Sequence, residues 1–294
     1  MIIINKRVSA LVILMLVLFS SCTGRKTLEK EYNAEAKVSI ADTNRLSQAY
    51  SVPDPENKRN LSTERKEHSY GVAKNGQPHS ISVEAQKYFA SLGKNAFCYD
   101  NITKEKVLYL TFDCGWENGC TSAILDTLKE KNVPAAFFCT LDHIDAEPDL
   151  IRRMICEGHI VGNHSANHPD FSKISREQMA SEIFECEERL RTEFNYQPIF
   201  FRFPEGAYTE NALDLVCSMG YSAAFWSCAY ADWDVENPNG GDYAFEKVTA
   251  RLHPGAVILL HSVSPDNAEA LGRIIDFARE NGYEFRALSN FPLQ

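Results

Sequence analysis

Four short stretches of the chain carry polar residues that could perform chemistry, and each contains or follows an apolar run. They are residues 106–115 (KVLYLTFDCG), 163–169 (NHSANHP), 201–206 (FRFPEG) and 259–262 (LLHS). An ionised carboxylate such as Asp113, at the end of a buried strand, is costly unless it is paired or takes part in a reaction. The sequence therefore predicts a site in which the three later stretches supply partners for Asp113.

His164 and His168 are four residues apart, so in a helical turn they project from the same side, as a pair of metal ligands must. Taken alone, such a pair is more often one core histidine and one surface histidine. Asp113 at the same predicted end of the fold favours a site for a divalent metal ion. Asp113 is then a candidate general base for a water molecule whose pKa the metal lowers from about 15.7 to about 7. As an isolated acid it could equally cap a helix.

Arg202 lies within the apolar sequence IFFRFP, where a buried guanidinium requires a partner. Asp113 is the obvious partner, and a neighbouring guanidinium would keep that acid ionised and oriented, as a general base must be. Pro204 and Gly206 follow, and they predict a shaped turn whose backbone N–H groups could face an oxyanion.

His261 ends the apolar run AVILLH and is a candidate general acid, because histidine titrates near neutral pH. Asp232 could orient His261 and hold it protonated, and Trp233 offers a flat face for a sugar ring. A structural histidine, a turn acid and a rim aromatic are the alternatives, and they stay open at this point. The sequence contains no GxSxG motif and no phosphate-binding glycine loop, so neither a serine-hydrolase elbow nor a phosphate cradle is indicated.

From residue 107 onward, short β-rich runs alternate with longer helical ones, which is typical of parallel strands joined by helical crossovers. The predicted strands are 107–112, 135–140, 159–163, 199–203, 222–227, 256–260 and 283–287. The predicted helices are 82–92, 121–130, 149–156, 176–191, 210–219, 243–251 and 267–280. Gly158, Gly220 and Gly282 follow three of these helices, where a left-handed C-cap favours glycine. The carboxyl ends of the strands in a parallel α/β barrel open onto one face, so the polar stretches would meet there.

The composition is that of a folded chain, because 44% hydrophobic and 24% charged residues among 294 supply enough apolar material for one substantial domain. The net charge of -10 argues against nucleic acid as a partner. Nine cysteines are scattered and form no CxxC pair, which argues against a structural zinc knot. Cysteines in apolar runs are predicted to be small buried residues; these are Cys139, Cys156, Cys186, Cys217 and Cys228.

Residues 1–22 are predicted to be a signal segment, because Lys6 and Arg7 precede an apolar stretch that is too short to span a membrane comfortably. The sequence LFSSC resembles a lipoprotein signal, in which Cys22 would be lipidated; simple cleavage or a retained anchor are the alternatives. Residues 23–79 are polar and are predicted to be a linker, which leaves 80–294 as the folded domain. The protein is expected to be exported to the outer face of the cytoplasmic membrane or to the cell wall.

The motifs TFDCG, HSANHP, RFPEG, ADW and LLHS, in this order and at these separations, resemble the five motifs of the polysaccharide deacetylase family, with its NodB-like domain (carbohydrate esterase family 4). The resemblance runs from about residue 107 to the C-terminus and implies a distorted (β/α) barrel of about seven parallel strands. The longer segments TFDCGWENG and FWSCAYADWD resemble the branch that deacetylates muramic acid in peptidoglycan, the delta-lactam-biosynthetic de-N-acetylases of spore cortex.

The resemblance implies a role for each residue singled out above. It implies that Asp113 is the base and His261 the acid. It also implies that His164 and His168 bind a divalent cation. Arg202 would orient the base and Asp232 would support the acid, while the backbone N–H of Glu205 would help to hold the oxyanion.

Cys114 is a departure from the family, most of which has at this position a second aspartate that serves as a third metal ligand. The muramic acid branch also tends to lack that aspartate. A thiolate at Cys114 could bind zinc directly, or the side chain could be buried and leave a site completed by water. Zinc is the expected cation, with manganese or cobalt as alternatives.

The expected activity is metal-dependent removal of the acetyl group from N-acetylmuramic acid in peptidoglycan, which releases acetate and permits formation of a muramic delta-lactam. A same-class alternative is a deacetylase of N-acetylglucosamine in peptidoglycan or chitin oligomers. An alternative of another class is a noncatalytic, membrane-tethered glycan-binding protein, because the family's third metal ligand is missing. Peptidoglycan glycan strands are the expected partner, and a peptidoglycan amidase is expected to act on them first.

Overall fold

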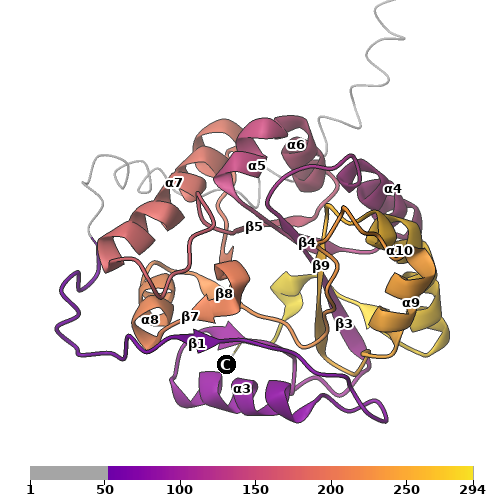
Figure 1. Cartoon of the computed structure of the whole chain (residues 1–294), viewed down its shortest axis with the longest axis horizontal. Helices are drawn as coiled ribbons and strands as arrows, with labels where there is room; N and C mark the ends of the chain where they lie inside the picture. The colour runs from indigo at the N-terminus through magenta and orange to yellow at the C-terminus, as the bar shows by residue number, and fades with distance from the viewer. Residues whose placement is uncertain (1–51, 294) are drawn as a thin grey trace, which may run out of the picture. The chain divides into compact units, whose positions relative to one another are not determined.

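A curved sheet of parallel strands forms the centre of the molecule (Figure 1). The computed structural model describes residues 52–293. The strand order is β10-β3-β4-β5-β6-β8-β2, and β9 also pairs with β3. The bounds are β2 Ala96–Phe97, β3 Val107–Cys114, β4 Ala135–Cys139, β5 Ile160–Asn163, β6 Phe200–Phe201, β8 Ser222–Ala224, β9 Ala256–His261 and β10 Glu284–Phe285. All the predicted strands are confirmed, and β2, of two residues, is one that the sequence did not indicate.

The sheet curls round so that β9 lies between β3 and the segment that follows β8. In that segment the Ser227 N–H donates to the Val257 carbonyl over 3.0 Å, and the Leu259 N–H donates to the Cys228 carbonyl over 2.9 Å. On its other side, β9 pairs with β3 in a register that sets Asp113 opposite His261. The predicted barrel-like α/β fold is therefore confirmed, and its curvature turns the ends of distant strands toward one space.

Helices cover the outside of this sheet, with α4, α9 and α10 on one side and α7 and α8 on the other (Figure 1). The bounds are α3 Ser80–Ser91, α4 Thr121–Lys131, α5 Leu141–Ala146, α6 Pro148–Cys156, α7 Arg176–Phe194, α8 Glu210–Ser218, α9 Gly241–Thr249 and α10 Pro265–Glu280, with short 3-10 turns η2 Pro204–Gly206 and η3 Leu288–Asn290. The predicted helices are all confirmed. The sequence missed α5, because its 6 residues are too few to show a helical apolar period. Gly158, Gly220 and Gly282 have φ of 82°, 94° and 81°, as their predicted left-handed positions require.

Alternate residues of β3 enter two separate hydrophobic clusters. Val107 and Tyr109 belong to the first cluster, which fills the space between the sheet, α3 and α8. Leu110, Phe112 and Cys114 belong to the second, which packs the sheet against α4, α9 and α10. Because successive side chains of a strand point to opposite faces, the last two residues of β3 are directed to opposite sides of the sheet.

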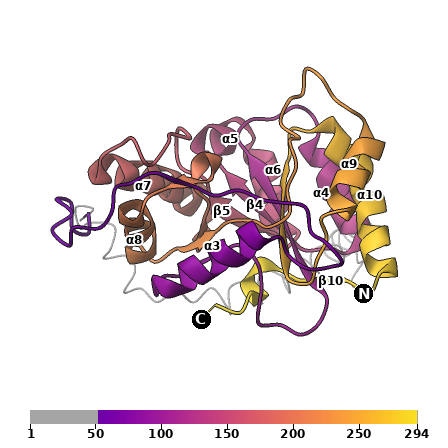
Figure 2. The ribbon, with the colours of Figure 1, turned by 60° about the horizontal axis from the view of Figure 1, so that its bottom comes forward.

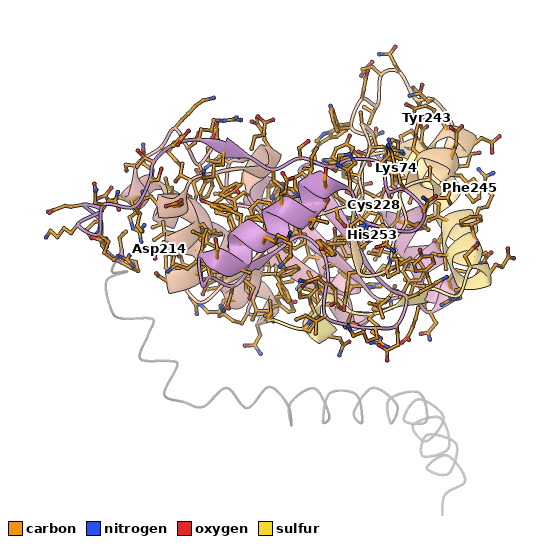
Figure 3. All side chains as sticks on the ribbon, turned by 90° about the horizontal axis from the view of Figure 1, so that it is seen from below. Lys74, Asp214, Cys228, Tyr243, Phe245 and His253 are labelled. Carbon is orange, nitrogen blue, oxygen red and sulfur yellow. The ribbon has the colours of Figure 1, made fainter. Side chains whose placement is uncertain are left out.

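The predicted linker of residues 23–79 is wrong from residue 52 onward. This segment belongs to the same compact unit as the barrel, and β1 Lys66–Glu67 pairs antiparallel with β7 Ala207–Tyr208. Figure 2 shows it running across the face of the molecule beside α3. Asp214, labelled at one end of the molecule in Figure 3, binds Arg59 of this segment. Ion pairs and backbone hydrogen bonds, and not a regular row of apolar side chains, hold this segment in place. The sequence therefore shows no apolar periodicity there that would have predicted a packed element.

The predicted signal segment, the lipidation of Cys22 and the first part of the predicted linker lie outside the described residues. Between residues 52 and 293, no helix is both long enough and apolar enough to cross a membrane.

The described cysteines are all free thiols. Cys139, Cys186 and Cys228 are buried, as predicted. The prediction is wrong for Cys156, which is exposed at the end of α6, and for Cys217, which is partly exposed on α8. Apolar neighbours in sequence do not decide which face of a helix a cysteine occupies, because successive helical residues point in different directions.

Candidate active site

A cavity of about 730 Å³ opens at the carboxyl ends of the strands. Most of the residues singled out from the sequence line it, namely Asp113, His164, His168, Glu205, Trp233 and His261. Arg202 and Asp232 lie directly behind this lining and bind Asp113 and His261. The prediction that these stretches meet around Asp113 is therefore confirmed.

Arg202 and Asp113 form a buried ion pair. The Arg202 Nη1 lies 2.7 Å from Asp113 Oδ1, and the guanidinium is 0% exposed. Its other N–H groups donate to the Ala224 carbonyl over 2.9 Å and to the Phe225 carbonyl over 3.4 Å, and it lies 4.0 Å above the Phe138 ring. Burial, the largest single effect, raises the pKa of Asp113, but the Arg202 charge and hydrogen bond, together with the nearby His164 and His261, outweigh it and hold that pKa below its ordinary value. Asp113 is thus an ionised, fixed carboxylate, as a proton acceptor must be.

His164 and His168 lie on the loop after β5, and not in the helical turn that the sequence predicted. Ser165 and His168 adopt left-handed backbone conformations, with φ of 69° and 54°, which a helix cannot contain. The loop still brings the two rings within 4.8 Å of each other, centre to centre, at an angle of 79°. Their closeness therefore comes from a turn of the backbone and not from helical spacing.

The histidine pair fits a divalent cation. A carbonyl oxygen can only accept, so the 2.9 Å contact between His164 Nδ1 and the Arg202 carbonyl places the ring proton on Nδ1. This leaves Nε2 as an acceptor, 3.6 Å from Asp113 Oδ2, which is the usual arrangement of a metal-binding histidine with its supporting carbonyl. Burial lowers the pKa of His164 to about 4, so the ring is neutral at pH 7, as a ligand must be.

Asp232 holds His261 through two contacts. Its Oδ1 lies 2.6 Å from His261 Nδ1, and its Oδ2 accepts from the His261 backbone N–H over 2.8 Å. Burial, the largest single effect, lowers the pKa of His261, but the charge and hydrogen bond of Asp232, together with the Asp113 charge, outweigh it and raise that pKa. His261 is therefore poised as a proton donor, and Trp233 lies against it with 5.7 Å between ring centres.

Asn267 supports the His261–Asp232 pair, and it is a residue that the sequence analysis missed. Its side-chain N–H donates to Asp232 Oδ2 over 2.6 Å and to the His261 carbonyl over 3.1 Å, while its oxygen accepts from the Tyr230 hydroxyl over 2.6 Å. The available signal was only that a polar residue, Asn267, sits in the first turn of a helix that begins after LLHS. Many helices carry such a residue, so the signal was too weak to single it out.

Glu205 lines the cavity in a left-handed conformation, with φ of 57°. Such a backbone is uncommon for a residue other than glycine, and it concentrates at functional sites. The next residue, Gly206, is also left-handed, with φ of 68°, and its carbonyl accepts from the His68 N–H over 2.9 Å. The turn predicted from Pro204 and Gly206 is present, and a neighbouring strand holds it.

That strand begins an N-terminal strap, residues 66–70, which the sequence did not indicate. Residues 67–70 line the cavity, and the His68 ring lies 2.6 Å from the Trp226 carbonyl. Burial lowers the pKa of His68 to about 4, so this ring is neutral and donates to that carbonyl. Trp116, 50% exposed, also lines the cavity and was not predicted, although it follows Asp113 closely in the chain.

Cys114 does not join the histidine pair. It is 0% exposed and packs in the second hydrophobic cluster, whereas Asp113 lines the cavity on the opposite side of β3. Of the two possibilities left open by the sequence, the structure supports a buried residue that is not a ligand of the His164–His168 site.

Comparisons with known proteins agree with this geometry. Residues 100–224 match the family model described as polysaccharide deacetylase. The chain is 41% identical over 201 residues to the peptidoglycan-N-acetylmuramic acid deacetylase PdaA of Bacillus subtilis, covering 68% of this chain and 76% of that protein. It is 31% identical over 204 residues to a peptidoglycan-N-acetylglucosamine deacetylase of Bacillus cereus, covering 68% of this chain and 73% of that protein.

A solved structure of Bacillus subtilis PdaA, a family 4 carbohydrate esterase, superposes with a TM-score of 0.74 and 37% identity, covering 79% of this chain and 98% of that one. The fold and the arrangement of the motif residues thus lead to the same conclusion as the sequence similarity. This chain belongs to the polysaccharide deacetylase family, hydrolases that cleave N-acetyl amide bonds of sugars.

Proposed function

We propose that this protein removes the acetyl group from N-acetylmuramic acid in peptidoglycan. The 41% identity to an N-acetylmuramic acid deacetylase supports this choice of sugar. The observation that carries the chemistry is the placement of an ionised acid, Asp113, opposite a histidine of raised pKa, His261, on neighbouring strands at one cavity. A base and an acid on either side of one amide are what its hydrolysis needs.

The residues divide the proton transfers between them. Asp113 takes the proton of the attacking water, and Arg202 keeps the carboxylate ionised and aimed. His261 gives its proton to the departing sugar amine, so the amide C–N bond breaks and acetate leaves. We assign the backbone N–H of Glu205 to the oxyanion that forms on the acetyl carbonyl, since the left-handed turn holds this residue at the cavity wall.

A divalent cation held by His164 and His168 would polarise the acetyl carbonyl and lower the pKa of the attacking water. We propose zinc, because imidazole nitrogens are ligands that zinc favours.

The glycan strand is proposed to lie across the two exposed tryptophans. Trp116 and Trp233 are 50% and 57% exposed, and both line the cavity. Flat aromatic faces at the mouth of a polar site suit the apolar faces of sugar rings.

The biological setting is part of the proposal. The freed amine of muramic acid would cyclise with the lactyl group to a delta-lactam, as in spore cortex, on strands already stripped of peptide by an amidase. The protein would act outside the cell, held to the membrane by a lipid on Cys22. These points rest on the motif resemblance and the signal-like start of the chain.

The test is acetate release from peptide-stripped peptidoglycan by the intact chain and by Asp113→Asn, each with and without a chelator. We expect acetate together with free muramic amine or its lactam from the intact chain, identified by mass spectrometry. Asp113→Asn should lower turnover by ~10²- to 10⁴-fold, the usual contribution of a general base. The chelator should abolish turnover, and added zinc should restore it.

Each outcome has a distinct meaning. Glucosamine as the released sugar, with no muramic amine or lactam, would reject the proposed substrate and favour the activity of the Bacillus cereus relative. Glycan binding that survives in Asp113→Asn, with no acetate from the intact chain under any metal, would support the noncatalytic alternative. The acid and base residues, both present and brought together, argue against that alternative.

A further inference from the structure

A second group of potential metal ligands lies beneath the floor of the cavity and has no part in the proposed reaction. The Sγ atoms of Cys114 and Cys139 and a ring nitrogen of His143 all lie within 4.8 Å of one another. All three residues are 0% exposed. Buried free thiols are ordinary, but a fully buried imidazole beside them requires a physical reason, because its ring nitrogens are polar.

His143 lacks the hydrogen bonds that a buried imidazole normally makes. Among residues 52–293, neither Nδ1 nor Nε2 finds a hydrogen-bond partner. The Trp116 backbone and the Glu117 carboxylate lie close enough to affect the ring, but neither forms a hydrogen bond of normal geometry with it. Buried polar groups are nearly always satisfied, so an orphaned ring aimed at two thiols indicates a missing partner.

The fold builds this group from three backbone features. The parallel register of β3 and β4 sets Cys114 directly beside Cys139. Thr140 follows and caps α5, its side-chain oxygen accepting from the His143 N–H over 3.2 Å. This cap starts the helix so that His143 lies in its first turn, next to the two sulfurs. All three ligand atoms are therefore carried by well-defined elements and not by loose loops.

We propose that Cys114, Cys139 and His143 bind a thiophilic divalent cation, zinc by preference, at a site separate from the His164–His168 pair. Two thiolates and an imidazole are typical zinc ligands, and they disfavour magnesium, calcium and manganese. A tetrahedral zinc ion with Zn–S bonds of ~2.3 Å places its ligand atoms slightly less than about 4 Å apart, which is compatible with ligand atoms that all lie within 4.8 Å of one another.

The charges balance at such a site. Binding releases the two thiol protons to solvent, and the two thiolates neutralise the cation, so no net charge is left in the apolar cluster around it. Three protein ligands leave one tetrahedral position for a water molecule. Gly115 and Thr140, which adjoin Cys114 and Cys139 in the chain, line the cavity, so the cavity lies next to these two ligands along the chain.

Cobalt titration tests the proposal, because thiolate-bound Co²⁺ has an intense charge-transfer absorption that cobalt bound by histidine and carboxylate alone lacks. The full chain, purified in detergent with a reductant and freed of metal, is titrated with Co²⁺. We expect the thiolate band to develop and then to disappear when Zn²⁺ displaces the cobalt. Metal analysis of the zinc-loaded chain should give two zinc ions for each chain.

Matched variants separate the two sites. Cys139→Ser and Cys114→Ser should lose the band, and His143→Gln should weaken cobalt binding by ~100-fold or more, since loss of a ligand costs at least as much as loss of a second-shell partner. Cys228→Ser removes an equally buried thiol, whose Sγ lies 3.9 Å from the Val248 carbonyl, and should keep the band. A double His164→Ala, His168→Ala chain should also keep it.

Three results would overturn the proposal. The first is a folded intact chain, by circular dichroism, that develops no thiolate band. The second is a band that persists in both Cys139→Ser and His143→Gln. The third is a band lost in the double histidine variant, which would mean that Cys114 turns toward His164 and completes that site. Should a serine variant fail to fold, the intact chain and the double histidine variant still decide the question.

Discussion

At the scale of single residues, two ion pairs of opposite purpose define the site, one of them buried and the other partly buried. Arg202 favours the ionised form of the Asp113 carboxylate, whereas Asp232 favours the protonated form of the His261 ring. Each pair works because its partners are shielded from water, and opposite charges attract each other more strongly away from water.

Replacing Arg202 by methionine should destabilise the fold by about 3 kcal/mol, because it leaves Asp113 buried without its counter-charge. Urea unfolding followed by circular dichroism measures this. In an Asp113→Asn background the same change should cost clearly less, since the stranded charge is gone. Equal costs in the two backgrounds would contradict the claim that the ion pair is the cause.

The alkaline side of the pH profile should report His261. Because its pKa is raised and its protonated form is the donor, activity should fall as the pH rises through that pKa. The stability that the Asp232 pairing contributes follows the same direction. It is fully present at a pH below the pKa that His261 has in the unfolded chain, and it is lost as the pH rises through the higher pKa that His261 has in the folded chain.

Asp232→Asn should therefore move the alkaline limb of kcat/KM to lower pH, because burial then acts on His261 without the opposing carboxylate. Rates of acetate release across the pH range measure this shift. An alkaline limb that stays in place would mean that another group sets it.

At the scale of elements, the strap holds the η2 turn that carries Glu205. Gly206 is at the centre of this arrangement, because a Cβ added there would lie 2.8 Å from the Trp226 ring and 3.2 Å from the His68 carbonyl. Gly206→Ala should shift the turn and lower kcat by ~10-fold or more, since displacements of about 1 Å at a site can cost 10²-fold.

Gly282→Ala is the matched control for this change. Gly282 is also left-handed, with φ of 81°, but a Cβ there would meet no atom within 4 Å. It should share the backbone strain of Gly206→Ala, seen as a loss in thermal stability, while kcat stays at the wild-type value. Equal kcat losses in both variants would show that strain in general, and not the position of the turn, is responsible.

At the scale of the whole molecule, the folded unit begins near residue 52 and not near residue 80. Arg176, buried on α7, donates to the Pro53 carbonyl over 2.6 Å and pairs with Asp214 over 2.7 Å. The segment from 52 to 79 thus connects one end of the barrel to the cavity wall.

A chain that begins at residue 52 should keep the activity, whereas a chain that begins at residue 80 should lose most of it. The shorter chain lacks the strap, so the Trp226 carbonyl loses its bond from the His68 ring and the Arg176 guanidinium loses its bond to the Pro53 carbonyl, at about 1–3 kcal/mol for each lost hydrogen bond. Arg176 keeps its bonds to Asp214 and Asn211. Acetate release and urea unfolding compare the two. Full activity from the shorter chain would instead support the domain boundary at residue 80 that the sequence predicted.

The sequence by itself determined the central strands, most helices and the residue types of the site. Asp113, Arg202 and His261 could be recognised because each polar residue ends or interrupts an apolar run, and local period and composition report burial. The fold class followed from the alternation of those runs with helices.

Only the tertiary structure decided the rest, because it depends on hydrogen bonds and registers between residues far apart in the chain. The loop that brings His164 to His168, the support of Asn267 and the strap over the η2 turn all arise in this way. So does the direction of Cys114, which the pleat of β3 turns away from Asp113 and toward Cys139. No local sequence pattern specifies which neighbouring element each face of a strand will contact. The face on which Cys114 lies places this thiol next to Cys139, in the proposed second site.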